Sequence, residues 1–184
     1  MKAMKKILAY TLAAVVALSS LQGASAATQS PTTSNVQPVT REDVKTSTGA
    51  KVDVKKDGTA IFSAVKSTSA TSIAVPEKVV VNGVKYTVTT IDAMAFAKAK
   101  KTTKLTLPAS IKKISAGAFF GVKKLKTVVL KGKKSIKVEK DAFIGLNTKK
   151  LTIKVNKNMS KKELNKLKKV LKKAGFKGKV KKLQ

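Results

Sequence analysis

Three copies of a six-residue phrase, repeated at a nearly constant spacing, constrain the fold of this chain more than any other feature. The copies read IDAMAF at residues 91–96, ISAGAF at 114–119 and VEKDAF at 138–143. Their phenylalanines, Phe96, Phe119 and Phe143, are 23 and 24 residues apart. Equivalent positions of stacked repeats become neighbours. We therefore expect these rings to form a buried structural spine rather than an exposed aromatic platform for sugars or bases.

Each copy is followed by a short β-like phrase, KLTL at 104–107, TVVL at 127–130 and KLTI at 150–153. The Ala-Phe pairs themselves are expected on short helices at 92–98, 116–122 and 140–146. One strand and one short helical turn in a period of roughly 20–29 residues are typical of a leucine-rich-repeat solenoid. The predicted fold class is an α/β repeat.

The phrase LTLPASIKKISAGAFFGVKKL at residues 105–125 resembles the BspA-type leucine-rich repeat of bacterial surface proteins. The resemblance extends from about Ile73 to the C-terminus and implies a secreted or cell-surface interaction scaffold. The cysteine of the family pattern is replaced by Ala99, Val122 and Leu146, so this position is expected to pack in the core. The family's proline is present at Pro76 and Pro108, which makes the third unit degenerate.

The first 26 residues have the pattern of a cleaved secretory signal. Three lysines are followed by an apolar run at 7–18 and by Ala24-Ser25-Ala26, a signal-peptidase type of site. The apolar run is short for a membrane span, which needs about 20 apolar residues. We therefore expect a protein that is exported, has no transmembrane segment and is secreted or associated with the cell surface.

The composition argues against an enzyme. The 184 residues include no cysteine and no histidine, which removes thiol nucleophiles, imidazole bases and the common zinc ligands. Glu139 and Asp141 are expected to diverge, and no glycine-rich phosphate loop follows a strand. We expect no catalytic residue, no cofactor and no metal.

Differences in sequence pattern divide residues 27–155 into a spacer, a cap and the repeats. Residues 27–48 are rich in Thr, Ser, Gln and Pro and are expected to form a flexible spacer. Residues 49–72 alternate around Asp57-Gly58 and predict a β-hairpin cap. The repeats are assigned to 73–155, with an inserted hairpin at 78–88 around Asn82-Gly83. Tyr86 in that hairpin is expected to pack across the strands, although an exposed ligand contact is the alternative.

Residues 156–184 predict a lysine-rich helical cap. Ser160 and Glu163 form a capping-box pattern, Gly175 ends the helix, and a leucine stripe runs between them. From residue 149 onward the chain has 15 lysines and one acid. Six of these lysines avoid the stripe and are the candidate polyanion-binding residues: Lys161, Lys162, Lys168, Lys169, Lys172 and Lys173.

Two functions remain open from the sequence. The first is an exported binding module whose partner is a protein or an anionic surface polymer, such as teichoic acid or an acidic glycan. The second is a structural envelope component attached to anionic wall polymer through its C-terminal lysines. Nucleic acid is not expected as a partner, because the chain has one arginine and no interleaved aromatics in the basic region. The lysine excess can also be background composition. A monomer is expected.

Overall fold

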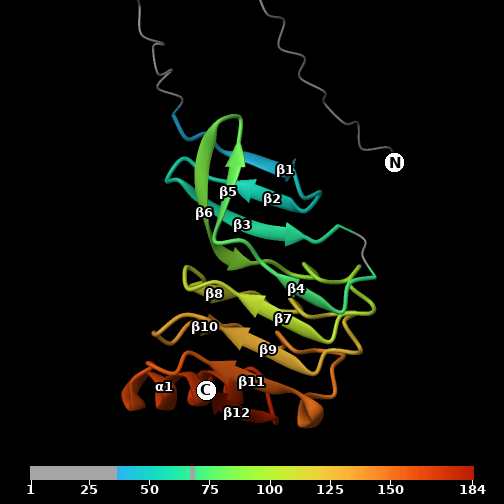
Figure 1. Ribbon diagram of the computed structural model, residues 1–184, viewed down its shortest axis with the longest axis vertical. Coiled ribbons are helices and arrows are strands. Elements are labelled where there is room, and N and C mark those ends of the chain that lie inside the picture. Colours follow the sequence, from blue (N-terminus) through green and yellow to red (C-terminus); the bar gives the residue numbers. More distant parts are fainter. Residues whose placement is uncertain (1–36, 67–68) are drawn as a thin grey trace, which may run out of the picture. The chain divides into compact units, whose positions relative to one another are not determined.

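The computed structural model describes residues 37–66 and 69–184. The predicted signal at 1–26 and the first part of the predicted spacer lie outside these residues. The described part consists of strands joined by turns, with one α-helix near the C-terminus (Figure 1). The repeated phrases are thus built here from short strands and turns, without α-helices.

A parallel five-stranded sheet runs along the repeats. Its strands follow one another in chain order, so each repeat adds one strand (Figure 1): β4 (Ser72–Ala74), β7 (Lys104–Leu107), β9 (Thr127–Leu130), β11 (Thr152–Val155) and β12 (Lys179–Lys182). Apolar side chains stay in register across it. Leu105 pairs with Val128, Val128 with Ile153, and Ile153 with Val180. Strands that alternate buried and exposed residues place one face of this sheet in the core.

A second, seven-stranded sheet combines the N-terminal segment with short strands of the repeats. Its members are β1 (Arg41–Lys45), β2 (Lys51–Val54), β3 (Thr59–Ala64), β5 (Lys78–Val81), β6 (Val84–Ile91), β8 (Lys113–Ile114) and β10 (Lys137–Val138). The pairs β1–β2, β2–β3 and β5–β6 are antiparallel, whereas β3, β6, β8 and β10 pair in parallel. The first residues of the three repeated phrases, Ile91, Ile114 and Val138, therefore lie in neighbouring strands of this sheet.

A column of five phenylalanine rings runs through the buried core. Phe96 and Phe119 have ring centroids 5.8 Å apart, and Phe119 and Phe143 are 5.2 Å apart, with nearly parallel planes. Phe62 continues the column at 5.8 Å beyond Phe96, and Phe176 continues it at 5.4 Å beyond Phe143. All five rings are buried. The column therefore joins the N-terminal β-segment, three repeats and the C-terminal segment into one core.

The Ala-Phe pairs lie in turns, and the prediction of short helices at 92–98, 116–122 and 140–146 is wrong. Met94, Gly117 and Asp141 occupy equivalent positions in these turns, and all three have positive φ, at 55°, 63° and 61°. A left-handed residue so close to the phenylalanine interrupts any helical turn. Backbone bonds then run between repeats, from Met94 N–H to Gly117 O at 3.1 Å and from Gly117 N–H to Asp141 O at 3.0 Å.

The third repeat is shifted by two residues from its expected register. Sequence similarity had paired KLTI at 150–153 with the preceding phrases, but β11 is Thr152–Val155, and Thr152 lies opposite Thr127. A 3-10 turn at Thr148–Lys150 precedes it. This turn takes up the extra residues, so Leu151 is buried before the strand begins.

Two expectations for the N-terminal segment also change. The predicted spacer at 27–48 includes β1, which pairs with β2, so this part of it is ordered. The hairpin at 78–88 is not a peripheral insertion, because β6 pairs with both β3 and β8 and thus joins the N-terminal strands to the repeats. Tyr86 of β6 is fully buried opposite Val79, and its hydroxyl accepts a hydrogen bond from Val39 N–H at 2.9 Å.

Candidate functional site

The predicted lysines lie on helix α1 (Lys161–Lys173), the one α-helix of the described residues. Its inward face buries Leu167 and Leu171, and Leu164 is half-buried. Ser160 begins the helix, and its hydroxyl accepts a hydrogen bond from the backbone N–H of Glu163 at 3.2 Å. The apolar stripe thus fixes which face of α1 meets the core.

All six candidate lysines are exposed on the remaining faces of α1: Lys161, Lys162, Lys168, Lys169, Lys172 and Lys173. The ion pairs found among residues 37–66 and 69–184 join Lys51 to Asp43 and Lys113 to Glu139, and neither involves α1. The helix therefore presents a group of cations without an intramolecular counter-ion in the described part of the chain. Such a group raises the local concentration of anions.

Glu163 does not complete the predicted capping box. Its Oε2 atom instead accepts a hydrogen bond from the backbone N–H of Ser135 at 2.6 Å, in the loop before β10. The only acid of the C-terminal region is therefore used to dock α1 onto the preceding repeat. Among the described residues, Glu163 forms no ion pair with the exposed lysines of α1.

Strand β12 adds further lysines beside the helix. Lys179, Lys181 and Lys182 are exposed on this edge strand, and Val180 is half-buried. A shallow polar pocket beside it combines lysines with threonine hydroxyls and is lined by Thr127, Thr152, Lys154, Lys181, Lys182, Leu183 and Gln184. Lysines on an edge strand also hinder pairing with another strand. The alternation Lys179-Val180-Lys181 is the sequence signal for these exposed residues, which were not among the candidate site residues.

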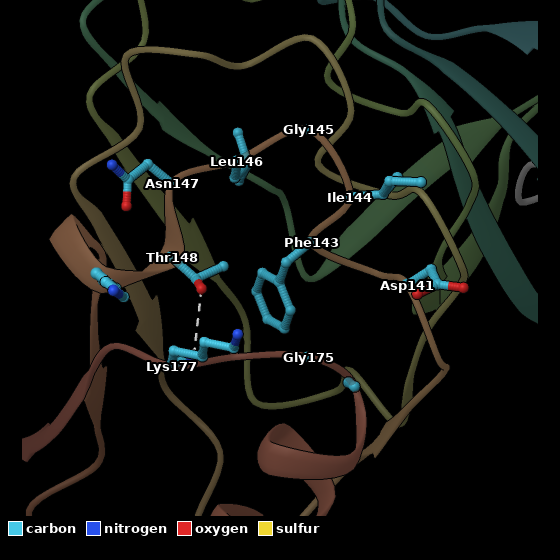
Figure 2. Close-up of a pocket in the computed structure, with 11 residues that line it drawn as sticks. Asp141, Phe143, Ile144, Gly145, Leu146, Asn147, Thr148, Gly175 and Lys177 are labelled. Atoms are coloured by element: carbon cyan, nitrogen blue, oxygen red, sulfur yellow. Dashed lines mark hydrogen bonds between the residues drawn. The ribbon is translucent and has the colours of Figure 1, made fainter.

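A pocket of about 340 Å³ lies where the third repeat meets the C-terminal segment (Figure 2). Figure 2 shows the Phe143 ring in the middle of the lining residues, with Asn147 and Thr148 on one side and Asp141 on the other. The hydroxyl of Thr148 accepts a hydrogen bond from Lys177 N–H at 3.2 Å. Asp141 is the one carboxylate of this lining, and Lys149 and Lys177 are its cations.

Across residues 37–66 and 69–184, no group of three or more potential metal-binding side chains comes together. Within the same residues, no helix has the length and apolar character required to cross a bilayer.

Comparison with known proteins gives two matches. The family model described as the BspA type leucine rich repeat region matches residues 89–183 in six copies. A crystal structure of a leucine-rich repeat protein from Bacteroides capillosus ATCC 29799 superimposes with a TM-score of 0.51 at 25% sequence identity. The match covers 68% of this chain and 87% of that one. No curated protein matches. The resemblance found in the sequence is confirmed, and the chain belongs to the BspA-type leucine-rich repeat family.

Proposed function

We propose that this protein is an exported interaction module of a bacterial cell surface and that the lysines of α1 hold it to an anionic polymer. Leucine-rich repeats of this family support a role in protein interaction. The observation that carries the polyanion part is the division of α1 into a buried leucine face and an exposed lysine face. In this proposal α1 closes the last repeat and binds the polymer at the same time.

Lysine suits a loosely ordered polyanion such as teichoic acid or an acidic glycan. Its ammonium is a point charge on a flexible stem, so it tolerates anions in many positions, whereas arginine favours fixed bidentate contacts. Lys161 and Lys162 lie at the positive end of the helix dipole, where a cation is unfavourable. A bound anion would remove this repulsion, because anions are favoured at helix N-termini.

The test replaces all six candidate lysines of α1 with glutamine and measures retention on immobilised wall teichoic acid at low salt. Glutamine keeps most of the helix propensity, so the fold should persist. We expect retention to fall at least about tenfold, a loss of about 1.4 kcal/mol. The wild-type interaction should also weaken steeply with added salt, because salt screens exposed charges.

A matched control has the same change in net charge elsewhere. It replaces six exposed lysines of β-turns and repeat turns with glutamine: Lys55, Lys56, Lys100, Lys101, Lys123 and Lys124. If the control variant loses as much retention as the α1 variant, binding depends on the net charge of the protein and not on where the lysines lie. The proposal requires the control to stay within about threefold of the wild type, well below the tenfold loss that corresponds to 1.4 kcal/mol.

Export is tested separately. The signal pattern at 1–26 and the absence of cysteine favour a cleaved protein beginning at Ala27. Mass spectrometry of the protein from culture medium and from salt-washed walls should give this mature mass. Recovery of the uncleaved chain from the cytosol would contradict the proposed location. Recovery from the medium alone would contradict attachment to the wall.

A further inference from the structure

Three large apolar side chains are exposed on consecutive repeats. Met94 is 54% exposed, Phe120 45% and Ile144 54%. Each belongs to one of the turns that carry the phenylalanine column, and Phe120 and Ile144 directly follow a column ring in sequence. We call Met94, Phe120 and Ile144 the turn-face row. Phe120 and Ile144 hold equivalent positions, one residue after a column ring, whereas Met94 lies two residues before one. Exposed apolar groups that lie together mark interaction surfaces, unlike apolar residues scattered singly.

The side chains of the row lie against the backbone of neighbouring turns. A Cβ atom built on Gly145 would be 3.5 Å from Phe120 Cδ2, and one built on Gly117 would be 3.9 Å from Ile144 Cγ2. Phe120 therefore extends over the next repeat, and Ile144 extends back over the preceding one. The Met94 N–H bonds to Gly117 O at 3.1 Å, which brings Met94 to the same glycine. Phe120 and Ile144 thus lie over each other's turns, and the backbone of Met94 is bonded to the turn that Ile144 covers.

Cations adjoin the row on its C-terminal side. Ile144 lines the pocket of Figure 2 together with Lys149 and Lys177, both of which are exposed, and with Asp141 as the one acid. The whole chain has a formal net charge of +31. Docking of a second copy on this surface would bring two strongly positive molecules together, so an acidic partner is favoured.

We propose that the turn-face row is a docking surface for an acidic protein segment. Apolar side chains of that segment pack on Phe120 and Ile144, and a carboxylate reaches Lys149 and Lys177. Aromatic residues surrounded by a polar rim are common anchors of protein interfaces. This inference specifies the protein partner of the proposed interaction module. It does not depend on the α1 lysines, so the two proposals can fail separately.

The test selects a random-peptide display library on the wild-type protein at physiological salt. Recovered peptides should combine acidic and apolar residues. Their affinity should fall at least about tenfold for the Phe120→Ser/Ile144→Ser variant. Val80→Ser is the matched control, because Val80 is 57% exposed on β5, in the hairpin, and should leave binding unchanged. The six-glutamine variant of α1 should also keep binding. The serine variant should keep a single cooperative melting transition, since Phe120 and Ile144 lie outside the buried column.

Several outcomes would overturn the inference. Failure to enrich any peptide, or enrichment of peptides without acids, would exclude an acidic segment as the partner. Equal binding by the serine variant would place the docking surface elsewhere. Loss of vesicle binding in the serine variant, measured with vesicles of anionic phospholipid and without any selected peptide, would assign the row to a lipid surface instead.

Discussion

The two ends of the repeat array complete the same ring column with different structures. At the N-terminal end, Phe62 comes from β3 in an antiparallel arrangement with β2. At the C-terminal end, Phe176 follows helix α1 and precedes β12, which pairs in parallel with β11. The segment at each end therefore contributes a phenylalanine ring to the column and a strand to one of the sheets, but its secondary structure differs between the ends.

Charge separates the two ends more strongly than structure does. Five of the nine acidic residues precede β5: Glu42, Asp43, Asp53, Asp57 and Glu77. From residue 149 onward there are 15 lysines and one acid. Both ends have the same packing task, so packing alone does not require the lysines. This difference is the reason for placing the proposed polyanion contact at the C-terminal end.

The largest expected effect of a single substitution comes from interrupting the column between the ends. Phe119→Ala removes a fully buried ring with a ring neighbour on each side and should cost about 3–5 kcal/mol of unfolding free energy. Chemical denaturation measures this loss. The terminal rings Phe62 and Phe176 each have one ring neighbour, so their alanine variants should lose less. If an end variant proved more damaging than Phe119→Ala, the column would not be the shared core.

Deleting the hairpin should destabilise the protein, because β6 joins the N-terminal strands to the repeats. Replacing residues 79–87 with a short link would remove the buried Val79, Val81 and Tyr86, together with most of β5 and the first half of β6. We expect cooperative unfolding to be lost. A sharp transition close to that of the wild type would show that β3 can join the repeats without the hairpin.

The repeated phrase was enough to identify the fold family and to place Phe96, Phe119 and Phe143 in one column, because equivalent repeat positions become spatial neighbours. It did not reveal Phe62 or Phe176, since neither is preceded directly by alanine. The short helices were mispredicted because the left-handed residues of the turns include Met94, which has no sequence signal for positive φ.

For the candidate site, the sequence predicted the features that depend on local pattern and missed those that depend on long-range contacts. The leucine stripe indicated which lysines of α1 avoid the core, because a helical period is a local property. The contact of Glu163 with Ser135 spans 28 residues and depends on how α1 packs beside the preceding repeat. The exposed positions of Met94 and Ile144 likewise follow from tertiary structure and not from their apolar character.

One side-chain hydroxyl at each end forms a hydrogen bond whose loss should cost less unfolding free energy than the loss of a buried ring, and the two costs should be similar. Tyr86→Phe removes the bond to Val39 N–H at the N-terminal end, and Ser160→Ala removes the N-cap of α1. Each change should cost about 1 kcal/mol. Thermal melts of the two variants would compare the ends directly. A negligible cost for Ser160→Ala would show that the buried leucine face and the Glu163 contact hold α1 in place without the N-cap.

The smallest expected effect concerns Glu139, which connects two repeats between the ends. Its carboxylate accepts hydrogen bonds from the Lys113 ammonium at 2.9 Å and from Ala116 N–H at 3.1 Å. The hydrogen bond from Lys113, followed by that from Ala116, lowers the pKa of Glu139 below its usual range. A carboxyl with a lowered folded-state pKa stabilises the fold above its unfolded pKa, and this contribution disappears as the pH falls through the folded value. Glu139→Gln should therefore reduce stability at neutral pH and have less effect in acid.

Melting temperatures of the wild type and Glu139→Gln measured from neutral to acidic pH would test this dependence. Asp57 provides the comparison at the N-terminal end, because the hydrogen bond from the Thr59 hydroxyl lowers its pKa in the same direction. Asp57→Asn should show the same dependence on pH, since both carboxylates are stabilised in the charged form. Asp57 is exposed and the Glu139 side chain is 31% exposed, so solvent screening keeps the two effects small. A difference between Glu139→Gln and the wild type that stayed constant across the pH range would assign the effect to packing of the side chain and not to its charge.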